Sequence, residues 1–180
     1  MNKGFFFDRD GIINELVNDE GKLRPPHKLD ELKINNELIK TINLIKKQYL
    51  IFLVSNQPDV ARGSLSLDSL GKINDAIFEK IEFKDSEFEI NDNPERKKPN
   101  PYMINKLISK YALNSKESWL IGDRWVDIQA GRDAGLNTIL LEKSYSYDPN
   151  SSGEMDTKLK ANIVIKNYSD FHELVIHQFL

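Results

Sequence analysis

The chain has 180 residues, of which 39% are hydrophobic and 29% charged, and its formal net charge is −3. This balance is typical of a folded globular protein and unlike that of a disordered chain. The absence of cysteine excludes disulfides, a thiolate nucleophile and zinc sites built on cysteine ligands. The near-neutral charge argues against a nucleic-acid-binding face, and no apolar run is long enough for a membrane span. We therefore expect one cytoplasmic domain over residues 1–180, without membrane or nucleic-acid partners.

Short apolar runs alternate with helical patterns along the chain, as in the βαβ units that build a parallel sheet. Within the motif core 5–141 and the C-terminal strand and helix 161–180, the expected elements follow in chain order. The first half has a strand at 4–7, a long excursion over 11–34, a helix over 35–48, a strand at 49–54 and a helix capped by Asp68 and reaching Ile81. A strand at 88–90, a loop over 91–101, a helix over 102–112, a strand at 118–121 and a helix over 126–134 follow. The chain then has a strand at 138–141, a polar loop over 144–160, a strand at 162–165 and a last helix capped by Ser169.

Polar clusters follow three of these strands, and another precedes a helix. Asp8–Gly11 holds two carboxylates two residues apart, which suits a divalent cation or a nucleophile with an acid/base partner. Ser55–Gln57 offers a hydroxyl and backbone N–H groups that can hold phosphate oxygens. Lys97–Pro101 presents cations, and Gly122–Asp127 places acids one helical turn apart. Because ligands bind at the carboxyl ends of parallel strands, we expect these clusters to share one pocket.

Each cluster taken alone also has an ordinary structural explanation. A strand exit would account for Asp8–Gly11, a turn for Ser55–Gln57, a solvated basic loop for Lys97–Pro101, and helix capping for Asp123. Their order along the chain is the more specific signal. In that order, FDRDG at 7–11, Ser55, Lys98, and Gly122-Asp123 with Asp127 resemble the four motifs of the haloacid dehalogenase (HAD) superfamily of phosphatases.

The resemblance implies a HAD-like Rossmannoid α/β fold, a doubly wound parallel sheet with central strand order 5-4-1-2-3 and only minimal cap loops over the pocket. The strings FFFDRDGIIN, SNQPDVARG, KKPNPYM and IGDRWVDIQAGRDAG narrow it to the branch of histidinol-phosphate and heptose-bisphosphate phosphatases. That branch usually holds a structural zinc on cysteine and histidine side chains just before the third motif. Here the region reads EINDNPERKKP, so we expect Mg²⁺ as cofactor and no structural zinc.

The resemblance also implies a role for each motif residue. Asp8 would attack phosphorus and form an aspartyl-phosphate, and Asp10 would protonate the leaving group and then activate water. Ser55 and Lys98 would hold the phosphoryl oxygens. The Mg²⁺ ligands would be the Asp8 and Asp123 side chains and the Asp10 carbonyl, with Asp127 orienting Lys98 or metal-bound water. The residues expected to contact the substrate are Arg9, Asn56, Gln57, Lys97 and Arg124.

The expected substrate is a small sugar phosphate, and the resemblance favours D-glycero-D-manno-heptose 1,7-bisphosphate cleaved at C7, in the synthesis of lipopolysaccharide, capsule or another glycan. Histidinol phosphate and polynucleotide 3′-phosphates stay open as alternatives within the branch, although the near-neutral charge counts against the second. A catalytically silent sugar-phosphate-binding module is the alternative from another class, and the intact motif acids argue against it. We expect the protein to be a monomer.

Overall fold

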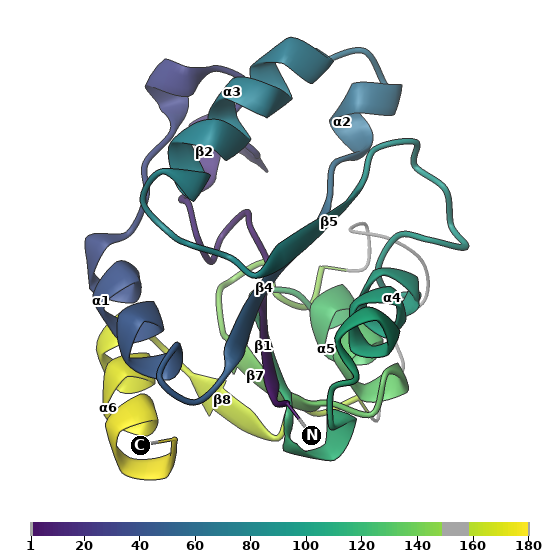
Figure 1. Ribbon diagram of the computed structural model, residues 1–180. Helices are drawn as coiled ribbons and strands as arrows, with labels where there is room; N and C mark the ends of the chain where they lie inside the picture. Colours follow the sequence, from purple (N-terminus) through teal and green to yellow (C-terminus); the bar gives the residue numbers. More distant parts are fainter. Residues whose placement is uncertain (1, 149–158, 180) are drawn as a thin grey trace.

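The computed structural model describes residues 2–148 and 159–179. Its centre is a six-stranded sheet in the order β5-β4-β1-β6-β7-β8, in which every neighbouring pair is parallel (Figure 1). The strands are β1 (Gly4–Phe7), β4 (Leu50–Asn56), β5 (Asp85–Glu89), β6 (Trp119–Gly122), β7 (Asn137–Leu141) and β8 (Ile163–Ile165). Counted along the chain within this sheet, the first five follow the expected order 5-4-1-2-3, and β8 adds a sixth strand beside β7.

Helices cover both faces of the sheet. The face shared by α1 (Asn36–Ile45), α3 (Leu67–Phe78) and α6 (Tyr168–Gln178) buries one apolar cluster. The other face buries a second cluster under α4 (Tyr102–Tyr111) and α5 (Trp125–Asp133). Successive side chains of a strand point to opposite faces, so Phe5 and Phe7 belong to the first cluster and Phe6 to the second. Figure 1 shows α1 beside α6, and α4 and α5 across the sheet from them.

Two helix caps differ from the sequence-based expectation. Ser66, not Asp68, caps α3, because its Oγ accepts a hydrogen bond from Ser69 N at 3.0 Å. Asn167, not Ser169, caps α6, because its Oδ1 accepts one from Asp170 N at 2.8 Å. Each helix therefore begins earlier than expected, since several neighbouring residues of capping type compete for one position.

The excursion over 11–34 contains structure that the sequence did not indicate. It forms a small antiparallel hairpin of β2 (Val17–Asp19) and β3 (Lys22–Arg24), followed by the 3₁₀ turn η1 (Leu29–Glu31). Arg24 pairs with Glu31 at 2.8 Å, and His27 Nε2 lies 2.8 Å from Asp59 Oδ2 on the short helix α2 (Pro58–Ala61). These contacts hold the hairpin next to the carboxyl ends of the central strands.

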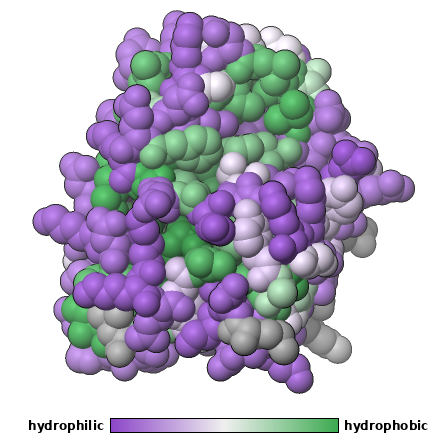
Figure 2. Space-filling model, in the orientation of Figure 1, coloured by the Kyte–Doolittle hydropathy of each residue, from purple (hydrophilic) through white to green (hydrophobic). Residues whose placement is uncertain are grey.

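Few further features bear on the site. A 3₁₀ turn, η2 (Ser115–Glu117), precedes β6. The expected polar loop over 144–160 is described only at its two ends, and residues 149–158 lie outside the described residues. Among the residues that the structure describes, no helix has the length and apolar character needed to cross a bilayer. Figure 2 shows a mainly hydrophilic face with apolar patches between the polar side chains.

Candidate active site

The carboxyl ends of three adjacent strands meet at one pocket of about 420 Å³. Asp8 follows β1, the central strand; Asn56 ends β4 on one side of it, and Asp123 follows β6 on the other. Lys98 reaches the same place from the loop before α4, and Asp127 from the first turn of α5. The parallel sheet thus brings together the polar clusters that the sequence separates by more than a hundred residues.

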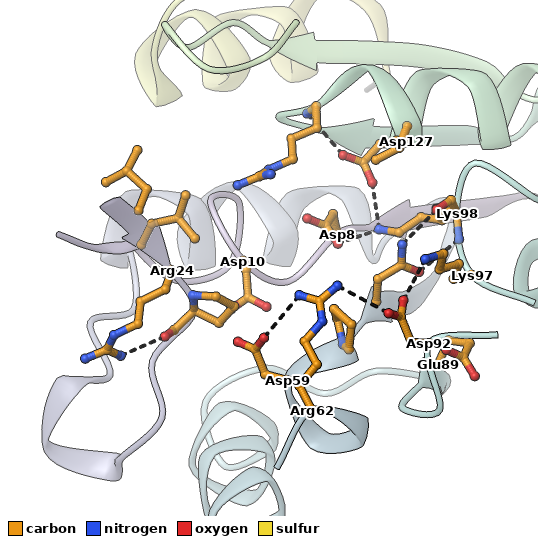
Figure 3. A pocket seen from close by; sticks show the side chains of 17 residues that line it. Asp8, Asp10, Arg24, Asp59, Arg62, Glu89, Asp92, Lys97, Lys98 and Asp127 are labelled. Atoms are coloured by element: carbon orange, nitrogen blue, oxygen red, sulfur yellow. Dashed lines mark hydrogen bonds and ion pairs between the residues drawn. The ribbon is translucent and has the colours of Figure 1, made fainter. Parts of the chain in front are cut away.

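Lys98 lies between two carboxylates, and we call Asp8, Lys98 and Asp127 the ion triad (Figure 3). Lys98 Nζ is 2.5 Å from Asp8 Oδ1 and 2.6 Å from Asp127 Oδ1, and all three side chains are at least nine-tenths buried. The pKa of Asp8 is raised to about 7, because the effect of burial and of the Asp127 and Asp10 charges outweighs the lowering effect of Lys98. Burial opposes the charge on Lys98, yet Asp127 and Asp8 together raise its pKa. The lysine therefore stays protonated between the two carboxylates.

The carboxylates beside the ion triad fit a divalent cation. Asp8, Asp123 and Asp127 each offer an oxygen, and these oxygens lie within 4.8 Å of one another. Both Asp127 oxygens are engaged, by Lys98 and by the backbone N–H of Arg124. In contrast, Asp123 Oδ1 is buried without a hydrogen-bond partner among the described residues. Burial, followed by the Asp8 and Asp127 charges, raises the pKa of Asp123 well above its usual value. An orphaned oxygen among crowded carboxylates matches Mg²⁺, which prefers oxygen ligands.

Two glycines permit this crowding. Gly11 has φ +92°, and a Cβ on it would lie 1.9 Å from Asp123 Oδ2. A Cβ on Gly122 would lie 2.2 Å from Asp127 Cβ. Both distances are far below van der Waals contact, so a side chain at either position would displace an acid of the site. The glycines of the DRDG and GD motifs are thus required by the close approach of the acidic side chains.

Asp10 lies at the pocket wall and is held by three neighbours. Its carboxylate accepts hydrogen bonds from Arg9, from Gln57 Nε2 at 2.6 Å and from Asn14 Nδ2 at 3.0 Å. Arg9 and Gln57, which are expected to contact the substrate, are both fully buried, and neither lines the pocket. Arg9 also donates to Asn74 Oδ1 of α3 at 3.0 Å. These residues instead fix the orientation of Asp10.

Ser55 and Asn56 also lie deeper than expected, because β4 continues through both residues. Ser55 is buried, and its Oγ accepts a hydrogen bond from Gln57 Nε2 at 2.8 Å. Asn56 lines the pocket, but its amide group is engaged with the backbone of Lys98: Lys98 N donates to its Oδ1 and its Nδ2 donates to the Lys98 carbonyl, both at 2.9 Å. Asn56 therefore holds the loop that carries the lysine of the ion triad.

The pocket mouth carries both cations and acids, and we use this name for Arg24, Asp59, Arg62, Asp92, Lys97 and Arg124. Lys97 Nζ is 2.6 Å from Asp92, and the same acid lies 3.2 Å from Arg62 (Figure 3). Lys97, which is expected to contact the substrate, thus lines the pocket as one partner of an ion pair with Asp92. Arg124 is different, because its guanidinium lies over the ring of Tyr145, with 5.2 Å between them.

Several residues of this site escaped the sequence analysis. Asn74 could have been noticed as a polar residue on the apolar stripe of a helix, between Ile73 and Ile77. Asn14 stands inside the string used for the resemblance, without a role. Arg62 likewise stands inside the string SNQPDVARG without an assigned role. No signal indicated Asp92 or Tyr145, because each enters the site through tertiary contacts of a loop.

Comparisons with known proteins agree with this geometry. A family model described as HAD-hydrolase-like matches residues 95–169. The D-glycero-beta-D-manno-heptose-1,7-bisphosphate 7-phosphatase of Pasteurella multocida is 26% identical, over 97% of each chain. The histidine biosynthesis bifunctional protein HisB of Actinobacillus pleuropneumoniae is 25% identical over 74% of this chain and 38% of its own length.

Solved structures share the fold along nearly the whole chain. The crystal structure of D,D-heptose 1,7-bisphosphate phosphatase from B. bronchiseptica, complexed with magnesium and phosphate, matches with a TM-score of 0.73. The two chains are 20% identical, and the match covers 97% of this chain and 98% of the other. In its motifs, in the placement of their side chains and in its fold, the chain is therefore similar to the haloacid dehalogenase superfamily.

Proposed function

We propose that this HAD-type phosphatase removes the C7 phosphate of a D-glycero-D-manno-heptose 1,7-bisphosphate by Mg²⁺-dependent hydrolysis. The observation that carries the reaction is the ion triad, which lines the pocket and lies beside the buried, orphaned Asp123 oxygen. The names of relatives that match along nearly the whole chain support the heptose.

Asp8 is the proposed nucleophile, because its carboxylate follows the central strand at the pocket floor. Attack on phosphorus forms an aspartyl-phosphate and releases the sugar oxygen. Lys98 neutralises the carboxylate in the free site and is placed to hold a phosphoryl oxygen during transfer. Asp127 positions this lysine, and its second oxygen fixes the start of α5 through Arg124 N.

Asp10 is the proposed acid and base. Its side chain is 11% exposed at the pocket wall, within reach of a leaving group or an attacking water. Protonated, it gives its proton to the departing sugar oxygen; ionised, it takes a proton from the water that hydrolyses the intermediate. The donors Arg9, Gln57 and Asn14 fix the direction of its carboxylate. Ser55 supports the same network, because its Oγ accepts a hydrogen bond from Gln57 Nε2.

Mg²⁺ would be held by the side chains of Asp8 and Asp123, with the Asp10 carbonyl as a further ligand. Asp8 binds Lys98 through Oδ1, which leaves Oδ2 for the cation, and Asp123 offers the buried Oδ1. When bound, the cation supplies positive charge that offsets the repulsion between the Asp8 carboxylate and the anionic phosphoryl group. The raised pKa of Asp8 and of Asp123 shows how unfavourable these acids are as anions without such a charge.

A phosphate-release screen tests the proposal. We expect Mg²⁺-dependent turnover, lost in EDTA, with the highest kcat/KM for heptose 1,7-bisphosphate among sugar bisphosphates, sugar monophosphates and histidinol phosphate. Histidinol phosphate is included because a histidine biosynthesis protein is among the relatives. A higher kcat/KM for it would overturn the heptose assignment and leave the phosphatase chemistry intact. Tight sugar-phosphate binding without turnover would instead indicate a silent binding module.

A further inference from the structure

A segment outside the four motifs folds against the site. Just after β7, the chain lies along the connection between β6 and α5. Trp125 N donates to the Ser146 carbonyl at 2.9 Å, and Ser146 Oγ donates to the Asp123 carbonyl at 2.5 Å. Ser146 is fully buried. These bonds fix the neighbouring Tyr145 against two residues of the site, Asp123 and Arg124.

The hydroxyl of Tyr145 acts on Asp123. It donates to Asp123 Oδ2 at 2.8 Å, while Oδ1 of the same carboxylate is the orphaned oxygen. One hydrogen bond therefore holds the carboxylate in the rotation that presents Oδ1 to a cation. Such partners of metal ligands commonly set metal affinity, because they remove the freedom of the ligand to turn away.

The ring of Tyr145 acts on Arg124. The other mouth cations each have a carboxylate partner: Arg24 with Glu31, Arg62 with Asp92, and Lys97 with Asp92. Within 2–148 and 159–179, Arg124 makes no ion pair with a carboxylate, and its guanidinium lies 5.2 Å from the centre of the Tyr145 ring. A guanidinium on a ring keeps its charge and its donors for a ligand, since the ring uses only one face. Arg124 is thus the mouth cation that is ready for an anionic group.

We propose that Tyr145 is a positioning residue for both ends of the substrate site: its hydroxyl orients Asp123 toward the cation, and its ring presents Arg124 to a second phosphate of the substrate. Only the part of this inference that concerns the second phosphate rests on the proposed substrate. It makes the segment after β7 a determinant of the preference for bisphosphates over monophosphates.

Two substitutions separate the hydroxyl from the ring. Tyr145→Phe removes the bond to Asp123 and keeps the ring beneath Arg124, whereas Tyr145→Leu removes both. The matched control is Tyr147→Phe, two residues along in the same segment, where the side chain is 45% exposed. Circular dichroism and thermal unfolding confirm that each variant folds before its binding is compared.

The hydroxyl is tested by calorimetric titration of the metal-free protein with Mg²⁺, without substrate. We expect Tyr145→Phe to raise the Kd for Mg²⁺ by about tenfold or more, and Tyr147→Phe to leave it unchanged. An unchanged Kd in Tyr145→Phe would overturn the role of the hydroxyl. This result does not depend on which phosphate ester the enzyme hydrolyses.

The ring is tested by competition against p-nitrophenyl phosphate hydrolysis. The inhibition constants of glucose 1,6-bisphosphate and glucose 6-phosphate give the preference for a second phosphate. We expect Tyr145→Leu to reduce that preference about two- to fivefold, and Tyr145→Phe to retain it. An undiminished preference in Tyr145→Leu would overturn the role of the ring. If the wild-type enzyme shows no preference for the bisphosphate, the proposed bisphosphate substrate and the role of the ring are both overturned. The Mg²⁺ titration still decides the role of the hydroxyl.

Discussion

Two adjacent lysines should respond very differently to the same substitution. Lys98→Met leaves Asp8 and Asp127 buried beside Asp123 without the ammonium that compensates them. Breaking a buried ion pair by removing one partner costs about 3–5 kcal/mol. Lys97→Met breaks one pair with Asp92 in which the side chains are 22% and 30% exposed, and such pairs contribute about 0–1 kcal/mol. The two variants should therefore differ in their free energy of unfolding by about 2–5 kcal/mol.

The assay is equilibrium unfolding in urea, followed by fluorescence of the two tryptophans, with EDTA present. In thermal unfolding, the same loss of about 3–5 kcal/mol lowers the melting temperature by about 6–20 °C for a chain of this size. Mg²⁺ at a hundred times its Kd should return about 2.7 kcal/mol to Lys98→Met, because the cation binds the folded state and not the unfolded chain. Turnover should fall about 10²–10³-fold, as when one preorganised phosphate donor is lost. Equal destabilisation of the two variants, or a loss below 1 kcal/mol in Lys98→Met, would refute the reasoning.

Three further predictions concern the support of the site and its cation. Asn74→Leu removes the acceptor of a buried Arg9 donor and should lower the free energy of unfolding by about 1.5–3 kcal/mol. The control, Asp75→Leu on the exposed side of α3, should change it little. A similar loss in both variants would contradict the role of Asn74 as the acceptor for Arg9. The rise in melting temperature caused by Mg²⁺ should be small near pH 5, grow until about pH 7 and then level off. The reason is that the pKa of Asp8 in the folded protein is about 7, so below that pH a proton competes with the cation for this carboxylate. A rise that is constant with pH would exclude that competition. The purified protein should hold no stoichiometric zinc, measured by elemental analysis after chelation and gel filtration, and bound zinc would show a site that the residues between β5 and α4 do not suggest.

The sequence predicted the parts of the molecule in which local pattern and position agree. Apolar runs end at polar residues, so β1, β4 and β6 and the acids that follow β1 and β6 could be located, and the order of strands followed from the resemblance. The carboxyl ends of parallel strands then placed Asp8 and Asp123 at one edge without any knowledge of contacts. Backbone geometry alone brings these two residues to the same edge of the sheet.

The direction of side chains could not be predicted in the same way. Arg9 and Gln57 stand in the motifs beside Asp10 and Asn56, yet both are buried. Arg9 donates hydrogen bonds to Gln57 Oε1 and to Asn74 Oδ1. The pairing of Lys97 with Asp92 depends on a loop in which Asp92 has φ +54°. The neighbouring residues do not predict this conformation. The hairpin of β2 and β3 is only three residues per strand and mostly exposed, so it lacks the apolar alternation by which a strand is recognised.

The central claim is that Asp8 accepts the phosphoryl group, and acid-quenched single turnover tests it most directly. Enzyme and heptose 1,7-bisphosphate are mixed with Mg²⁺, quenched in milliseconds, and digested for mass spectrometry of the peptide that carries Asp8. We expect one phosphoryl group on Asp8 that appears and decays at rates consistent with kcat, and we expect Asp8→Asn, a nearly isosteric change, to show neither the adduct nor turnover. Phosphate release by Asp8→Asn at a rate near that of the wild type, with no adduct on this peptide, would contradict the account.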